Sequence, residues 1–292
     1  MKNTSSFTPK LTADGSFTFF STEFGQAFHS DFGARQEAEL KFVGPLELRR
    51  KASGRKLRLL DVCYGLGYNT AAALAAIWEE NPDCLVELAG LEINPEVPLC
   101  AIAHCLLHCW PTPVPQLLSI LATDRQLQTD RIQANLIVGD ARHTIQQLKQ
   151  SGFLADAIFL DPFSPPACPQ LWTVEFLASV AGCLQPDGLL ATYSCSAAVR
   201  AALMAAGLKI GSTPPAGRRS PGTLAGFSLQ NLSQLSQQEQ EHLQTKAAVP
   251  YRDPHLCDTA EIILQRRFEE QQASPLEPSS RWKKRWYSRV EV

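Results

Sequence analysis

Short apolar runs alternate with segments of helical spacing through the middle of the chain. The apolar runs predict strands at residues 57–63, 85–91, 134–138, 156–160 and 188–193. Helices are expected between and after them, at residues 69–79, 95–109, 142–151 and 170–184. Strands that are apolar on both faces are typical of a parallel sheet covered by helices on both sides. The pattern therefore predicts a doubly wound, mostly parallel, Rossmann-like α/β sheet.

The two ends of the chain depart from this alternation. The start is rich in Phe, Ser, Thr and Gly, which predicts a small β-rich cap, and a helix over residues 33–48 that Gly44-Pro45 ends. Past residue 211 a Pro-, Gly- and Arg-rich loop precedes a short late strand and two helices, expected at residues 227–229, 233–246 and 258–272. We expect three parts: a cap and helix in 1–50, a core in 51–232, and a helical extension with a basic, aromatic tail in 233–292.

Composition narrows the class of protein without naming a function. The chain has 292 residues, of which 45% are hydrophobic and 19% charged, and its net charge is −2. This suits one large globular core and excludes a uniformly basic nucleic-acid coat. The start lacks the apolar segment of a secretory signal, and no apolar run approaches the ~18 residues that span a bilayer. With nine cysteines, we expect reduced thiols and a cytoplasmic location.

A glycine-rich turn follows the first predicted strand. Gly65 and Gly67 are two residues apart, a spacing that lets the backbone turn tightly and approach a ligand at the start of a helix. The full dinucleotide fingerprint needs a third glycine, and Thr70 stands in that place. Hydride-transfer chemistry is therefore disfavoured.

An acidic residue closes each of the first four predicted strands: Asp61, Glu92, Asp140 and Asp161. The carboxyl ends of parallel strands form the ligand crevice of such a sheet, and four carboxylates there repel one another unless a ligand uses them. A single strand-end acid is more often the N-cap of the next helix. Four in succession favour S-adenosylmethionine, whose amine is cationic and whose ribose and adenine offer hydrogen-bond donors.

Asp161-Pro162-Phe163-Ser164-Pro165-Pro166 is the segment best suited to catalysis. Asp161 and the Pro162 carbonyl can accept the hydrogens of an amine, which leaves the nitrogen lone pair free for the methyl group. The ring of Phe163 can stack on a planar base. The alternative is a proline-rich loop that only ends a strand.

Together these segments resemble the methyltransferase half of the bifunctional MnmC enzymes and its stand-alone forms. The resemblance runs from about residue 19 to about residue 227 and through 250–254. It rests on Phe28-His29-Ser30, Gly33-Ala34, Glu37, Gly65-Leu66-Gly67-Tyr68-Asn69, Asp161-Pro162-Phe163-Ser164-Pro165, Leu171-Trp172-Thr173, Leu190-Ala191-Thr192-Tyr193-Ser194 and Val199-Arg200.

The resemblance implies a methyltransferase that converts 5-aminomethyl(-2-thio)uridine to 5-methylaminomethyl(-2-thio)uridine at the tRNA wobble position. Asp161 and Phe163 would be catalytic. The cofactor, S-adenosylmethionine, would be bound by Asp61, Gly65, Gly67, Asn69, Glu92, Asp140, Ala141 and Asp161. The substrate would meet His29, Glu37, Pro162, Arg218 and Arg219.

The same resemblance sets expectations for partners. The anticodon stem-loop of tRNA would be the macromolecular partner, upstream enzymes of wobble modification would supply the aminomethyl group, and no membrane, metal or flavin would take part. Two departures stand out, because Asp61 stands where relatives can have Glu and Cys63 where Gly or Ser is common. The flavin-dependent oxidase half is expected to be absent.

For two other features the sequence allows either a functional role or a structural one. Cys100, His104, Cys105, His108 and Cys109 fan over more than one helical face, which favours packing over a zinc site. The tail 280–292 has a net charge of +4, leaving −6 for the rest, and its interleaved Trp and Tyr suit either RNA or a solvated terminus. Two other functions remain possible: transfer of a methyl or aminopropyl group to a small amine, and nucleotide binding without catalysis.

Overall fold

An eight-stranded, mostly parallel sheet forms the centre of the molecule in the computed structural model, which describes residues 7–215, 220–230 and 232–287. The strand order is β11-β12-β10-β9-β5-β6-β8-β7. The parallel strands are β5 (Lys56–Val62), β6 (Leu85–Glu92), β8 (Ile132–Val138), β9 (Ala155–Leu160) and β10 (Leu184–Thr192). The antiparallel strands are β7 (Gln126–Gln128) at one edge, β11 (Lys209–Ser212) at the other, and β12 (Thr223–Gly226) between β11 and β10. This confirms the predicted doubly wound α/β sheet.

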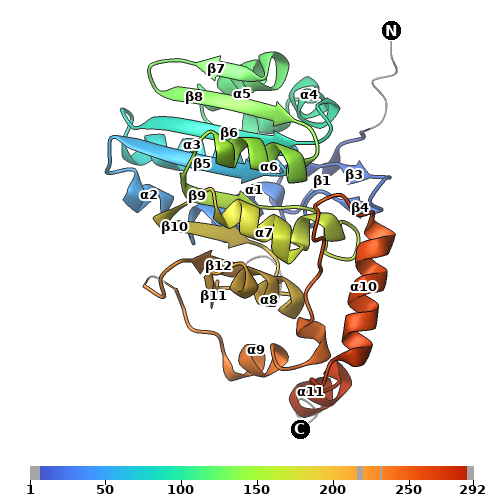
Figure 1. Ribbon diagram of the computed structural model, residues 1–292. Helices are drawn as coiled ribbons and strands as arrows, with labels where there is room; N and C mark the ends of the chain where they lie inside the picture. Colours follow the sequence, from blue (N-terminus) through green and yellow to red (C-terminus); the bar gives the residue numbers. More distant parts are fainter. Residues whose placement is uncertain (1–6, 216–219, 231, 288–292) are drawn as a thin grey trace.

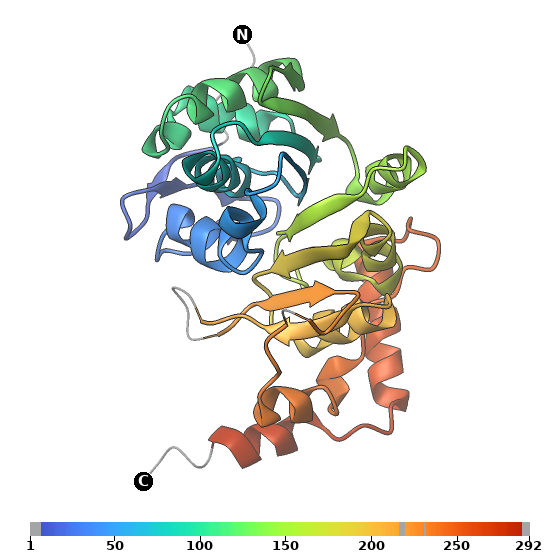
Figure 2. The same ribbon diagram turned by 90° about the vertical axis from the view of Figure 1, so that its left-hand side faces the viewer.

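Helices cover both faces of the sheet, as Figures 1 and 2 show. Neighbouring strand residues point to opposite faces, so Leu59 of β5 packs into one hydrophobic cluster and Leu60 into the other. One face is covered by α1 (Ala34–Glu37), η1 (Ala38–Val43), α2 (Leu48–Lys51), α3 (Tyr68–Glu80), α4 (Glu96–Ala103), η2 (Leu106–Cys109) and α5 (Val114–Asp124). The other is covered by α6 (Ala141–Gln150), η3 (Pro169–Trp172), α7 (Val174–Ala181), α8 (Ala197–Ala205) and α10 (Ala260–Ala273).

The order of the parallel strands creates one switch point. From β5 the chain proceeds through β6 to β8 on one side, and then returns to place β9 and β10 on the other. Ligands of open α/β sheets bind at the carboxyl ends of the strands at such a point. The crevice is thus expected where β5 and β9 end side by side, which is where Asp61 and Asp161 lie.

Two small antiparallel ladders form the N-terminal part of the chain. β1 (Lys10–Leu11) pairs with β2 (Phe17–Thr18), and β3 (Phe20–Ser21) pairs with β4 (Gln26–Ala27). Figure 1 shows these strands on the side toward which β8 and β10 point, so they lie near the carboxyl ends of the sheet. Within the described part of the chain, no helix combines the length and apolar character needed to cross a membrane.

Several expected elements differ from the observed ones, among them the following three. The expected strand 227–229 is wrong, because β12 ends at Gly226 and bends follow it. The expected helix 95–109 is interrupted where Cys105 adopts a left-handed φ of 57°, so α4 and η2 are separate. Helix 233–246 shortens to α9 (Gln237–His242), since the capping box of Ser236 and Glu239 starts it there.

The C-terminal extension packs beside β11 and β12 rather than hanging free. It contains α9, η4 (Lys246–Ala248), α10 and α11 (Ser279–Tyr287). Arg200 of α8, only 2% exposed, joins it to the sheet, since its guanidinium pairs with Glu239 at 2.8 Å and donates to the Thr223 hydroxyl at 3.0 Å and the Gly222 carbonyl. This buried guanidinium therefore links the C-terminal extension to the central sheet.

Replacing Arg200 by Met should lower the free energy of unfolding by about 3 kcal/mol, because it leaves buried acceptors and the Glu239 carboxylate without their partner. Urea unfolding followed by circular dichroism measures the change. Arg55→Met, at an exposed position, is the matched control and should stay within about 0.5 kcal/mol of wild type. Equal effects of the two substitutions would contradict the role given to Arg200.

Candidate active site

The turn between β5 and α3 brings main-chain N–H groups to the end of the sheet. Gly65 and Gly67 adopt positive φ values of 56° and 85°. A Cβ at Gly67 would lie 2.8 Å from the Tyr64 hydroxyl, so only glycine fits there. The Gly65 N–H donates to Glu92 Oε2 at 2.7 Å, which ties the turn to the end of β6.

Asp61 lies beneath this turn and is fully buried. Its Oδ2 accepts a hydrogen bond from the Thr70 hydroxyl at 2.7 Å, whereas its Oδ1 is buried without a hydrogen-bond partner. The pKa of Asp61 is raised to about 8, chiefly by burial and also by the charges of Asp161 and Glu92, while the Thr70 hydrogen bond opposes the shift. The carboxyl group is therefore largely protonated at neutral pH in the ligand-free protein.

Glu92 and Asp161 flank Asp61 on the two neighbouring strands. Glu92 is 7% exposed, and its Oε1 accepts from the Asn94 N–H at 2.9 Å. Burial raises the pKa of Glu92, although the backbone hydrogen bonds of Asn94 and Gly65 oppose the shift. Asp161 Oδ2 accepts from the Asn69 side-chain amide at 2.9 Å, so the first turn of α3 holds this carboxylate in place.

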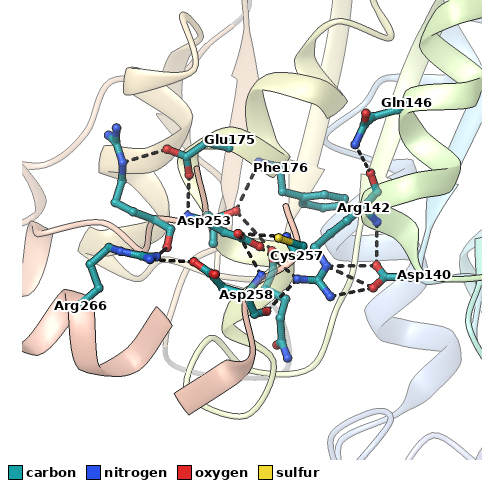
Figure 3. A network of polar contacts seen from close by, with 12 residues as sticks. Asp140, Arg142, Gln146, Glu175, Phe176, Asp253, Cys257, Asp258 and Arg266 are labelled. Atoms are coloured by element: carbon teal, nitrogen blue, oxygen red, sulfur yellow. Dashed lines mark hydrogen bonds and ion pairs between the residues drawn. The ribbon is translucent and has the colours of Figure 1, made fainter. Parts of the chain in front are cut away.

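Asp140 caps α6 and is held by the second residue of the same helix. Its Oδ1 accepts from the Arg142 N–H at 2.9 Å, and its Oδ2 from the Arg142 guanidinium at 2.7 Å. Figure 3 shows that guanidinium between Asp140 and a C-terminal segment that carries Asp253. These hydrogen bonds and the arginine charge outweigh burial and lower the pKa of Asp140, so it is anionic.

The loop after β9 is fixed on several sides. The Tyr193 hydroxyl donates to the Pro162 carbonyl at 2.9 Å, and the Trp172 indole donates to the Phe163 carbonyl at 2.8 Å. The Phe163 ring stacks on Phe24 with centroids 4.4 Å apart. The face that the sequence assigns to a base is thus covered by an N-terminal phenylalanine in the ligand-free protein.

A second contact closes the N-terminal cap over this loop. The Gln26 side-chain amide donates to the Ser164 hydroxyl at 2.6 Å and accepts from the Ser164 N–H at 3.2 Å. Nothing in the local sequence near Gln26 predicts this pairing, which joins residues 138 positions apart. The cap and the loop after β9 therefore form one wall of the site.

His29, Glu37 and Lys41 meet on the inner side of the cap. Burial lowers the pKa of His29 to about 4, so its imidazole is neutral and pairs with the Thr18 hydroxyl at 3.1 Å. Glu37 accepts from the Ser30 hydroxyl at 2.5 Å and pairs with Lys41 at 3.4 Å. Burial alone would raise the pKa of Glu37, but Lys41 and Ser30 lower it below the usual value.

Most of these groups surround one cavity of about 330 Å³. The predicted site residues that line it are His29, Glu37, Gly65, Asn69, Glu92, Asp140, Ala141, Asp161, Pro162 and Phe163. Asp61 and Gly67 do not line it, because one is buried below the turn and the other packs against Tyr64. Arg218 and Arg219 lie outside the described residues.

The sequence interpretation missed several lining residues, chiefly Phe24, Gln26, Phe28, Lys41, Arg142 and Tyr193. Lys41 and Arg142 are the lining residues that carry a permanent positive charge. Lys41 sits in the π-helical segment η1 with its side chain buried, which is an unusual place for a lysine and a usable signal. Arg142 is two residues beyond Asp140 and offered no such signal.

The structure also shows the surroundings of the cysteines that the sequence singled out. Cys63, at the pocket wall, has a pKa raised well above its ordinary value by burial, so it is a neutral thiol rather than a nucleophile. In the 100–109 segment, Cys105 is exposed while Cys100 and Cys109 are half-buried. Among the described residues, no group of three or more His, Cys, Asp and Glu side chains can hold a metal ion.

The two tryptophans of the tail contact α9. Trp282 is 6% exposed, stacks on His242 at 4.0 Å and donates its indole N–H to the Gln238 carbonyl. The Trp286 indole donates to Glu241 at 2.9 Å, and Arg285 pairs with Glu241 at 3.2 Å. These tryptophans serve to dock α11 on α9, so they are not free to stack on bases.

The residues around the cavity have the chemistry that S-adenosylmethionine requires. A cationic amine and sulfonium match the carboxyl groups of Glu92, Asp140 and Asp161, which line the cavity. Glu92, at the end of β6, can accept hydrogen bonds from ribose hydroxyls. Ala141 is the first residue of α6, so its N–H has no acceptor within the helix and can donate to a ligand. With the strand order and the glycine turn, this arrangement defines a Rossmann-like class I methyltransferase.

Comparison with known proteins gives the family. Residues 99–228 match the family model described as "S-adenosyl-L-methionine-dependent methyltransferase". The crystal structure of MnmC2 from Aquifex aeolicus is 32% identical, covers 92% of this chain and 86% of its own, and superimposes with a TM-score of 0.80. The chain therefore belongs to the MnmC2 family, the methyltransferase half of MnmC, and is an S-adenosylmethionine-dependent methyltransferase.

Longer relatives carry this unit together with other sequence. The bifunctional protein MnmC of Ralstonia nicotianae, named for tRNA 5-methylaminomethyl-2-thiouridine biosynthesis, is 30% identical over 75% of this chain. The match covers 34% of that protein, so the chain spans about a third of the length of such curated relatives. An uncharacterized protein of Methanocaldococcus jannaschii is 28% identical over 89% of this chain and 71% of its own.

The raised pKa of Asp61 predicts how stability depends on pH. The folded protein keeps a proton that the unfolded chain releases near its ordinary pKa of 3.8, so this contribution is complete below that pH and is lost as the pH rises toward about 8. Asp61→Asn removes the penalty. The difference in unfolding free energy between Asp61→Asn and wild type, measured in urea without cofactor, should shift in favour of Asp61→Asn as the pH rises from 5 to 8.5.

Asp83→Asn, at an exposed position, is the control and should follow the wild-type curve across the same range. A constant offset between Asp61→Asn and wild type at all pH values would show that Asp61 is ionised in the folded protein.

Proposed function

We propose that this enzyme methylates the 5-aminomethyl group of the wobble uridine in tRNA, giving 5-methylaminomethyl(-2-thio)uridine. The observation that carries the proposal is the Asp161 carboxylate, held by Asn69 at the wall of the cofactor cavity and followed by a fixed Pro-Phe loop. The names of the MnmC relatives supply the nucleoside. The tRNA anticodon stem-loop is the partner that this substrate implies.

The chemistry requires a neutral amine aligned with a methyl group. S-adenosylmethionine, when bound, supplies that methyl on a sulfonium. The nitrogen lone pair forms the new N–C bond as the S–C bond breaks, and the sulfur keeps the electron pair. Asp161 and the Pro162 carbonyl accept the amine hydrogens, and Asp161 takes the released proton directly or through water. Alignment of the two groups contributes the largest share, with ~7–11 kcal/mol available from positioning.

The cofactor contacts follow from the residues around the cavity. Glu92 holds the ribose hydroxyls, Asp140 and the Ala141 N–H hold the adenine, and the glycine turn with Asn69 meets the methionine part. Lys41 is the buried cation available for the methionine carboxylate. Asp61 acts from below the turn, where a cationic ligand lowers the cost of ionising its carboxyl group.

The acceptor enters beside the cap. For the uracil ring to stack on Phe163, the Phe24 ring must move away, since the two phenylalanines now stack on each other. His29 and Glu37 line the same side and shape the entrance. We assign residues 1–50 to this cover, 51–232 to the methyltransferase core, and 233–292 to a supporting extension.

Contacts to RNA beyond the cavity rest on basic residues. Arg218 and Arg219 are candidates for phosphate binding, as are the exposed residues Arg281, Lys283 and Lys284 of α11. Their contribution would be sequence-independent and would weaken with salt. The aminomethyl group must come from upstream wobble-modifying enzymes, which places the protein where tRNA matures, in the cytoplasm.

Two substitutions separate transfer from cofactor binding. Asp161→Asn keeps the shape of the side chain but removes the proton acceptor, so kcat on tRNA should fall at least ~100-fold while the Kd for S-adenosylmethionine changes little. Glu92→Gln should do the reverse, raising that Kd about tenfold with a smaller effect on kcat. Steady-state methylation of aminomethyl-bearing tRNA and calorimetric titration measure both.

Two results would count against the proposal. If Asp161→Asn retained wild-type kcat, the acceptor would not be gripped by this carboxylate. If purified wild-type enzyme methylated a polyamine or another small amine but not tRNA, the small-amine alternative would replace it.

A further inference from the structure

A segment of the C-terminal extension reaches the cofactor cavity through a single arginine. Residues 250–258 run past the N-terminus of α6, and Arg142 donates to the Asp253 carboxylate at 3.0 Å and to the Asp258 carbonyl at 2.9 Å. These partners are 111 and 116 positions away in the sequence. The segment also lies outside residues 99–228, which the family model matches.

Hydrogen bonds hold both the side chain and the backbone of Asp253 in place. It is fully buried, and its Oδ1 accepts from the N–H groups of Cys257 and Asp258 at 3.1 and 3.2 Å. Its own N–H donates to Glu175 of α7 at 2.8 Å. The carboxylate that faces Arg142 is thus rigid, and one guanidinium nitrogen has a fixed anchor.

The other side of the same guanidinium grips the carboxylate that faces the cavity. Arg142 Nε lies 3.2 and 3.1 Å from the two oxygens of Asp140, and a terminal nitrogen adds a bond of 2.7 Å. Such a planar fork fixes the orientation of a carboxylate as well as its charge. Figure 3 shows the three side chains in a row, from the extension to the pocket wall.

We infer that Asp253 is a positioning residue for cofactor recognition, acting through Arg142 to orient Asp140 toward the adenine amino group. The inference rests on the proposed function in assigning the adenine to Asp140. It makes the C-terminal extension part of the machinery that selects an adenine-bearing cofactor. Without Asp253 the Arg142 guanidinium would keep only the Asp258 carbonyl and Asp140 itself as partners, so the direction of the Asp140 carboxylate would be less fixed.

The test is discrimination between two ligands that differ only at the base. S-adenosylhomocysteine carries the 6-amino group, whereas S-inosylhomocysteine has an oxygen there that repels a carboxylate. Calorimetry on the full-length wild-type enzyme should give a preference for the adenine form of at least ~100-fold, because a site built for a donor rejects an analogue that lacks it. In Asp253→Asn this preference should fall about tenfold.

A matched control lies on the same segment. The side chain of Asp258 pairs with Arg266 at 2.7 Å and does not touch Arg142, so Asp258→Asn perturbs the segment but spares the anchor. It should keep the wild-type preference. Arg142→Lys keeps the charge but loses the planar guanidinium fork, so it should reduce the preference as Asp253→Asn does. It is the second variant to use if a thermal unfolding curve shows that Asp253→Asn is not folded.

The outcomes are separable. If Asp253→Asn and Asp258→Asn leave the preference unchanged, or weaken both ligands equally, Asp253 is only structural and the inference is overturned. If wild type itself shows no preference, the assignment of the adenine to Asp140 fails, whatever the enzyme does to tRNA. A loss confined to Asp253→Asn and Arg142→Lys supports the positioning role.

Discussion

The burial of carboxyl groups at one edge of the sheet is the constraint on which the rest of the site depends. Asp61 and Glu92 end neighbouring parallel strands away from water, and burial raises the pKa of both. The glycine turn, Thr70 and Asn94 supply hydrogen-bond donors that partly offset the cost. Under the proposed assignment, a cationic ligand rich in hydrogen-bond donors would offset the remaining desolvation cost and would thereby bind more tightly.

Much of this was accessible from the sequence, for physical reasons. Apolar runs separated by helical spacing define a parallel sheet, and the carboxyl ends of its strands must meet at one edge. The acids that follow those runs, Asp61, Glu92, Asp140 and Asp161, were therefore predicted to share one crevice. Glu92, Asp140 and Asp161 line the cavity, whereas Asp61 lies buried below the glycine turn. The glycine turn was predicted from spacing, and the geometry adds its reason at Gly67, where Tyr64 leaves no room for a Cβ.

The remainder depends on contacts between distant segments, which a single sequence does not encode locally. Nothing near Asp253 points to Arg142, and nothing near Gln26 points to Ser164. No element was predicted for residues 110–133, where α5 lies; Pro115 fits there because proline is tolerated in the first turn of a helix. The tail was left open between RNA binding and a solvated terminus, and neither alternative included the contacts that Trp282 and Trp286 make with α9.

The central claim is that the edge of carboxylates and the Pro-Phe loop transfer a methyl group to the amine of a wobble nucleoside. It is tested most directly by incubating the purified protein with isotopically labelled S-adenosylmethionine and tRNA that carries 5-aminomethyl(-2-thio)uridine, followed by mass spectrometry of the nucleosides. The account predicts one labelled methyl group on the 5-aminomethyl nitrogen of the wobble uridine and on no other nucleoside. An unlabelled wobble uridine, with the label elsewhere in the tRNA or nowhere, would contradict it.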